Sequence, residues 1–142
     1  MRTVPAILAA FVVFLAHTVP AYAEDPVDMS RRVIEEQIKA FLQDDADRAY
    51  SFAAPAIKAK FPDKDVFFAM VKKSYAPVYH PGNYAFGRNR LMADGAVVVH
   101  ELMISGKDGK NWKAMYKLAR QPDGAYKIDG VVIMPDLVSK GI

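Results

Sequence analysis

The chain has 142 residues, of which 52% are hydrophobic, a formal net charge of +3 and no cysteine. This length and apolar content suit one domain with a hydrophobic core. They exclude an intrinsically disordered protein, because disorder requires low hydrophobicity and high net charge. Without cysteine there is no disulfide, thiolate metal site or cysteine nucleophile, and a small charge without a Lys/Arg run argues against a nucleic-acid partner.

Residues 1–23 have the organisation of a secretory signal peptide. A positive start at Arg2 precedes an apolar run from Val4 to Val19, and Ala21-Tyr22-Ala23 provides an Ala-x-Ala cleavage site. The run is shorter than the roughly 20 residues that cross a bilayer, and Pro20 follows it. We therefore expect cleavage after Ala23, with an uncleaved membrane anchor as the alternative.

Cleavage would leave residues 24–142, which we expect to form a single α+β domain without a membrane segment. Animal secreted modules usually carry disulfides. A cysteine-free exported domain therefore fits a bacterial periplasm better, and we expect that localisation.

The first half of this domain has helical periodicity, with one apolar face and Asp, Ser or Pro at the boundaries. Asp28 or Ser30 can cap the first helix. Gln37 is an unusual long amide on the apolar face of that helix. The expected helices run from about Asp28 to Leu42, from Ala46 to Ala53, between Pro55 and Pro62, and from Asp63 to Pro77.

After residue 83 the periodicity changes to two, and three Asp-Gly pairs separate alternating segments, which is a hairpin signature. We expect a four-stranded antiparallel meander over residues 83–92, 96–105, 110–120 and 125–134. The predicted fold class is α+β, with the N-terminal helices packed on one face of a curved sheet.

The turns also predict which side chains share a face. If each Asp-Gly corner is a three-residue loop with a left-handed glycine, Arg88 lies beside His100, His100 beside Tyr116, and Tyr116 beside Gly130. This polar row crosses an otherwise apolar inner face, formed by Phe86, Val98, Leu102, Ile104, Trp112, Ala114, Leu118, Ile128, Val132 and Met134.

A two-residue turn at Asp94-Gly95 would instead place Arg88 opposite Glu101 on the outer face, as a surface ion pair worth little. The outer face mixes charged and apolar side chains and could be a partner surface. In the three-residue register it holds Glu101, Lys113, Lys117, Asp129, Val97, Val99, Met103, Met115, Val131 and Ile133.

Four segments, residues 44–55, 67–71, 75–81 and 122–131, resemble the exported bacterial family known as domain of unknown function 4864. The likeness extends from about Arg31 to Pro135. The order of elements is similar to the nuclear-transport-factor-2-like fold, a cone of helices closed by a bent sheet and often dimeric through that sheet. The resemblance implies this fold and export, but no activity, because the wider fold hosts isomerases, dehydratases and binding modules alike.

Five side chains are candidates for lining a pocket in such a cone: Arg88, His100, Tyr116, Gln37 and Trp112. His100 could act as a general base or hydrogen-bond donor, or be a core histidine satisfied by Tyr116 or a backbone carbonyl. A buried Arg88 would need a carboxylate or an anionic ligand. Gln37 either reaches the pocket or caps a backbone group.

Two further groups of residues, an aspartate cluster and a Tyr- and Pro-rich segment, can be explained by structural roles. Asp44, Asp45 and Asp47 resemble a catalytic carboxylate cluster, but helix capping explains one of them and a solvated corner the other two. The Tyr- and Pro-rich segment 75–81 either plugs the end of the cone or forms the lip of a cavity.

No phosphate-binding loop, nucleophile elbow or metalloprotease motif is present, so we assign no catalytic residue, metal ligand or cofactor. The leading hypothesis is an exported, non-catalytic domain that binds a small amphipathic or anionic ligand in an apolar cone. The alternatives are a homodimer or partner-interaction module that uses the outer sheet face, and a hydrolase or isomerase that uses His100 as its base.

Overall fold

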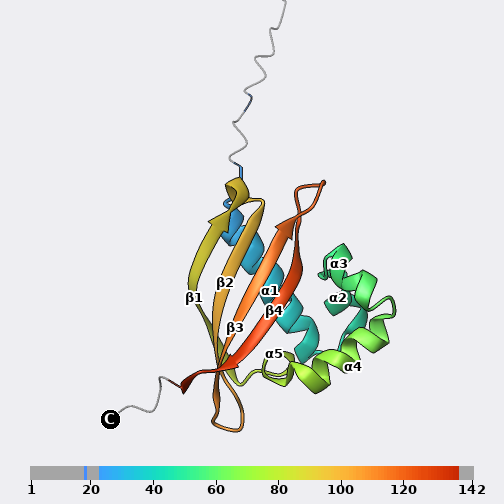
Figure 1. The fold of residues 1–142 in the computed structure, drawn as a ribbon, viewed down its shortest axis with the longest axis vertical. Helices are drawn as coiled ribbons and strands as arrows, with labels where there is room; N and C mark the ends of the chain where they lie inside the picture. The colour runs from blue at the N-terminus through green and yellow to red at the C-terminus, as the bar shows by residue number, and fades with distance from the viewer. Residues whose placement is uncertain (1–17, 19–22, 138–142) are drawn as a thin grey trace, which may run out of the picture.

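The computed structural model describes residue 18 and residues 23–137. The predicted signal peptide therefore lies almost entirely outside the described residues. In this part of the chain five α-helices precede four strands, and the helical first half and strand-rich second half are confirmed (Figure 1). The helices are α1 (Pro26–Leu42), α2 (Ala46–Ser51), α3 (Pro55–Lys60), α4 (Lys64–Ser74) and α5 (Ala76–Tyr79).

The helix boundaries follow local capping chemistry. Asp25, rather than Asp28 or Ser30, caps α1, because Pro26 occupies the first turn, where a missing N–H costs nothing. Asp45 caps α2, as expected from the sequence, by accepting from Arg48 N, and Asp63 caps α4 by accepting from Asp65 N. Pro77, expected to end the last long helix, instead lies in the short α5.

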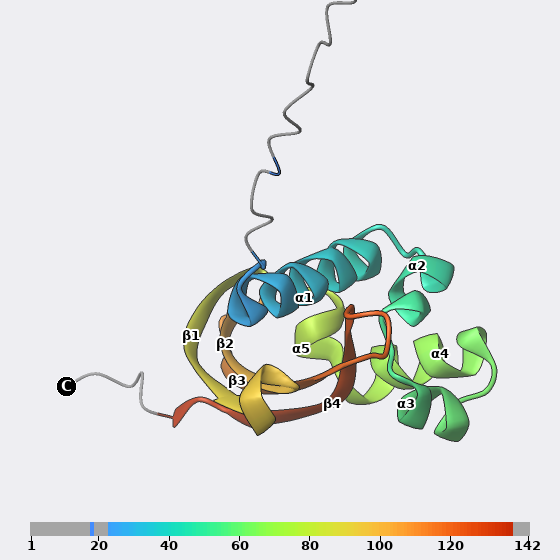
Figure 2. The same cartoon turned by 90° about the horizontal axis from the view of Figure 1, so that it is seen from above.

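The strands β1 (Asn83–Met92), β2 (Val97–Ser105), β3 (Asn111–Arg120) and β4 (Tyr126–Pro135) form one antiparallel sheet in the order β1-β2-β3-β4, as predicted. Helix α1 lies across one face of this sheet, and α2 to α4 lie beyond the β4 edge (Figures 1 and 2). The sheet is not strongly curled. The structure thus shows N-terminal helices packed on a four-stranded meander.

The β4 edge is joined to the helical half by backbone hydrogen bonds. Ile128 N donates to Phe52 O, and Ala54 N donates to Ile128 O, each at 2.8 Å. The segment between α2 and α3 therefore pairs with the strand at one point and holds the helices beside it. This docking sets the space between α3, α4 and β4.

The register prediction holds for the centre of the sheet and fails at two bulges. His100 pairs with Tyr116, as expected. In β1, however, a bulge between Phe86 and Asn89 places Asn89 opposite His100, so the inward placement of Arg88 is wrong. The first turn differs from the other two because Ala93, Asp94 and Gly95 all have positive φ (50°, 52° and 82°), whereas only the glycine does so in the later Asp-Gly turns.

A second bulge, at Asp129 in β4, reverses the prediction for the end of that strand. Leu118 pairs with Ile128 as expected, but Tyr116 pairs with Val131 rather than Gly130. One extra residue moves every later side chain to the other face. Val131 and Ile133 therefore pack against the core, whereas Val132 and Met134, predicted inside, are 59% and 39% exposed.

The core has two parts. One lies between α1 and the sheet and includes Ile34, Ile38, Leu102 and Leu118. The other joins the end of α1 to α2 and α4, and its buried members are Ala40, Phe41, Ala49, Phe67, Phe68 and Val71. The space where these two parts meet is not completely filled.

Candidate ligand-binding site

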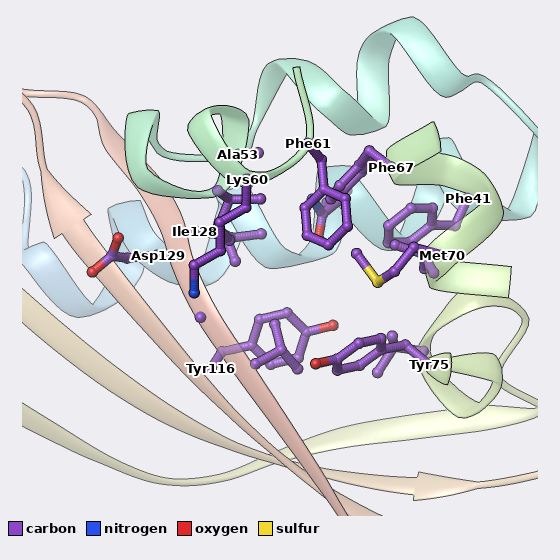
Figure 3. A pocket seen from close by; sticks show the side chains of 16 residues that line it. Phe41, Ala53, Lys60, Phe61, Phe67, Met70, Tyr75, Tyr116, Ile128 and Asp129 are labelled. Carbon is purple, nitrogen blue, oxygen red and sulfur yellow. The ribbon is translucent and has the colours of Figure 1, made fainter. Parts of the chain in front are cut away.

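A cavity of about 270 Å³ lies where α1, α3 and α4 meet β3 and β4 (Figure 3). Its lining is mostly carbon and rich in aromatic rings. The lining residues are Gln37, Phe41, Ala53, Ile57, Lys60, Phe61, Phe67, Met70, Val71, Tyr75, Val78, Tyr116, Ile128, Asp129, Gly130 and Val131.

Burial distinguishes the inner wall from the mouth. Phe41, Val78, Tyr116 and Ile128, from α1, α5, β3 and β4, are buried and form the inner wall. The partly exposed lining residues come from α3, from α4 and its C-terminal end, and from the β4 bulge, and Lys60 is exposed. The cavity therefore opens between α3, α4 and β4.

The hydroxyl of Tyr116 is the notable polar group of the inner wall. Tyr116 is fully buried, and its Oη has no hydrogen-bond partner among the described residues. The hydroxyl points into the cavity, toward the Tyr75 hydroxyl (Figure 3). Burial, with Tyr84 as a smaller cause, raises the pKa of Tyr116 well above its usual range. The phenol is therefore a neutral donor without an acceptor.

Gln37 fulfils both of the roles considered from the sequence. Its side chain lines the cavity, and its Nε2 donates to Ala49 O at 3.1 Å. This bond ties α1 to α2 and explains why a long amide occupies the buried face of α1, since a buried amide needs a partner.

The mouth of the cavity carries one anionic and one cationic side chain, and only the anionic one has an ion-pair partner among the described residues. The Asp129 carboxylate, displayed by the β4 bulge, is held by Lys117 Nζ at 3.3 Å. Lys60, on α3, makes no ion pair with any described residue. The mouth therefore offers a free ammonium beside a carboxylate that already has a partner.

His100 is buried but does not line the cavity. Its Nε2 lies 2.7 Å from Ser30 Oγ, which also lies 2.7 Å from Pro26 O. If the serine hydroxyl donates to the carbonyl, the imidazole N–H donates to the serine. Burial, and next the nearby Arg31, lower the pKa of His100 below 6.5. The histidine is satisfied by Ser30, which the sequence had suggested only as a cap.

Two other candidates also lie away from the cavity. Arg88 is on the outer face, 88% exposed, with its Nε 3.3 Å from Glu101 Oε2, as in the alternative register. Trp112 is partly buried and packs against the core between α1 and the sheet. The structure thus brings together only Tyr116 and Gln37 of the five candidates.

Sequence reasoning missed Lys60 and Asp129 and left the role of Tyr75 open. Tyr75 lines the cavity, so the segment of residues 75–81 forms part of the lip of the cavity, one of the two roles considered for it. Asp129 precedes Gly130 within a strand, and a glycine at such a position is a recognised sign of a bulge. Nothing in the local sequence marks Lys60, because its place depends on how α3 docks on β4.

Among the described residues, no group of three or more His, Cys, Asp or Glu side chains could hold a metal ion. The helices of this same part of the chain include none long and apolar enough to span a membrane.

The fold and the cavity define an α+β domain with helices on a meander sheet and a small, aromatic-lined cavity at the β4 edge. The chain belongs to the family described as domain of unknown function DUF4864, which it matches over residues 24–140. No curated protein matches it significantly in sequence.

Proposed function

We propose that this protein binds a small, largely apolar molecule in the cavity between the helices and β4. The supporting observation is the buried Tyr116 hydroxyl, which faces an apolar space and has no hydrogen-bond partner in the described part of the chain. Leaving a buried polar group unsatisfied costs about 1–3 kcal/mol. A ligand atom at Oη would remove that cost.

Size and chemistry favour binding over catalysis. At about 270 Å³, the cavity is slightly smaller than the small-molecule pockets typical of proteins, which start at about 300 Å³. His100, the buried imidazole, is engaged by Ser30 and lies outside the cavity lining. We further propose that the domain acts after export, as its N-terminal sequence and its resemblance to an exported family indicate, and that its fold is a variant of the nuclear-transport-factor-2-like cone.

Val131→Phe is expected to weaken binding of the neutral fluorescent probe 1-aminonaphthalene, whose two fused rings match the size of the cavity, at least tenfold. Val131 lines the cavity, so the larger ring would occupy part of the space at a folding cost of about 1–3 kcal/mol. Fluorescence titration measures the dissociation constant, and circular dichroism checks the fold.

Val132→Phe is the matched control, since Val132 is the next residue and is 59% exposed on the other face. It should bind the probe like the wild type. Equal binding by both variants, or no binding by the wild type, would refute the proposed cavity function.

A second candidate function, a homodimer or partner interface, is favoured by the uncovered outer face of the sheet. No helix of the described residues lies over this face (Figure 2). It displays the apolar side chains Val97, Val99, Met103, Met115, Val132 and Met134. Sedimentation velocity at micromolar concentration should show a dimer, and a strict monomer would eliminate the homodimer.

A further inference from the structure

We infer that the cavity is built for an aromatic carboxylic acid that carries a hydrogen-bond acceptor, such as a ketone, on its ring system. This inference rests on the proposed function, because it names the class of ligand for the same cavity. Three features support it: the aromatic walls, the phenol of Tyr116 and the ammonium of Lys60, of which the phenol has no hydrogen-bond partner and the ammonium no ion-pair partner within residues 23–137.

The walls favour a flat aromatic body. Phe41, Phe61, Phe67 and Tyr75 contribute rings, and Met70 a thioether, around one space (Figure 3). Aromatic rings stack or meet edge-to-face, and thioethers contact ring edges favourably. An apolar cavity of about 150 Å³ holds benzene, so one of about 270 Å³ has room for two fused rings.

The inner wall requires an acceptor. Tyr116 Oη has no partner among the described residues, and the phenol carries its proton. A neutral O–H in an apolar wall pairs best with an uncharged oxygen such as a carbonyl, because a carboxylate there would itself be desolvated at high cost.

The mouth provides the place for the charge. Lys60 is exposed and has no ion-pair partner among the described residues, whereas the neighbouring Asp129 is already held by Lys117 at 3.3 Å. Figure 3 shows the Lys60 ammonium beside β4 and the Tyr116 hydroxyl on the side of Tyr75. A ligand that meets both groups therefore carries its acid and its acceptor at separate ends.

Three probes separate these requirements: 6-acetyl-2-naphthoate, 2-naphthoate and 6-acetyl-2-naphthamide. The wild type should bind the first most tightly, because the second lacks the acceptor and the third lacks the charge. Isothermal titration gives the three dissociation constants without any substitution, so this comparison does not depend on a variant that folds.

Tyr116→Phe should weaken binding of both acetyl probes about three- to tenfold, the worth of one hydrogen bond, and leave 2-naphthoate unchanged. The fold should tolerate the change because the hydroxyl has no partner among the described residues. Tyr84→Phe is the matched control, since Tyr84 lies on β1 outside the cavity lining.

Lys60→Gln should weaken binding of the two carboxylates about two- to fivefold, leave the amide unchanged, and lose its effect at high salt. Lys73→Gln, an exposed change on α4 outside the lining, is the control.

If the wild type does not prefer 6-acetyl-2-naphthoate, or if Tyr116→Phe affects 2-naphthoate equally, the ligand class is wrong. Binding of 1-aminonaphthalene that is sensitive to Val131→Phe would then still support the proposed function. If neither probe family binds, both the ligand class and the proposed function fail.

Discussion

Replacing Phe41 by alanine is expected to lower the free energy of unfolding by about 3–5 kcal/mol. Phe41 is 2% exposed at the end of α1. Its ring centroid lies 6.0 Å from that of Phe68 and 6.2 Å from that of Tyr79, so it joins α1 to α4 and α5. The lost ring would leave a void that merges with the ligand cavity. Urea denaturation measures the loss.

Leu42→Ala is the matched control, because Leu42 is the next residue and is 46% exposed. An exposed change of this kind should stay within about 0.5 kcal/mol. A loss below about 1 kcal/mol for Phe41→Ala would show that the end of α1 is not held by this aromatic cluster.

Replacing Ser30 by alanine is expected to lower the free energy of unfolding by about 1–3 kcal/mol, because it leaves the buried imidazole of His100 without its partner. Ser51→Ala is the matched control. Ser51 also donates to a carbonyl of its own helix, that of Arg48, but it is exposed and has no histidine beside it. Equal losses in both variants would show that the contact with His100 contributes nothing.

His100 should also make wild-type stability depend on pH. The pKa of His100 is lowered in the folded state by burial and then by Arg31. As the pH falls through about 6.5, the unfolded chain takes up the proton first, so stability decreases until the folded-state pKa is reached. In His100→Gln this contribution should disappear, and a pH profile unchanged from wild type would contradict the assignment.

The parts of the fold that depend on residues close together in the sequence could be predicted from it. Asp45 and Asp63 cap helices because side-chain carboxylates satisfy nearby N–H groups. The meander followed from alternation between turns, and each turn glycine has the expected positive φ. His100 and Tyr116 pair across β2 and β3, since a continuous alternation fixes which side chains face the core.

The candidate site was predicted only in part because two bulges changed the register. Treating the three Asp-Gly turns alike favoured an inward Arg88, but the structure places it on the outer face, where its charge is satisfied by Glu101. In β4 the extra residue at Asp129 sends Val131 inward. Bulges of this kind depend on how the partner strand and the covering helices pack, which alternation alone does not encode.

By itself, the sequence determined the α+β class, the order of elements and two members of the cavity wall, Tyr116 and Gln37, because these depend on periodicity and capping. Tertiary structure alone decided that Ser30 satisfies His100, that Arg88 faces solvent and that Lys60 stands at the mouth of the cavity. These placements arise where segments distant in the chain meet, and only the last of them, where α3 docks beside β4, concerns the cavity.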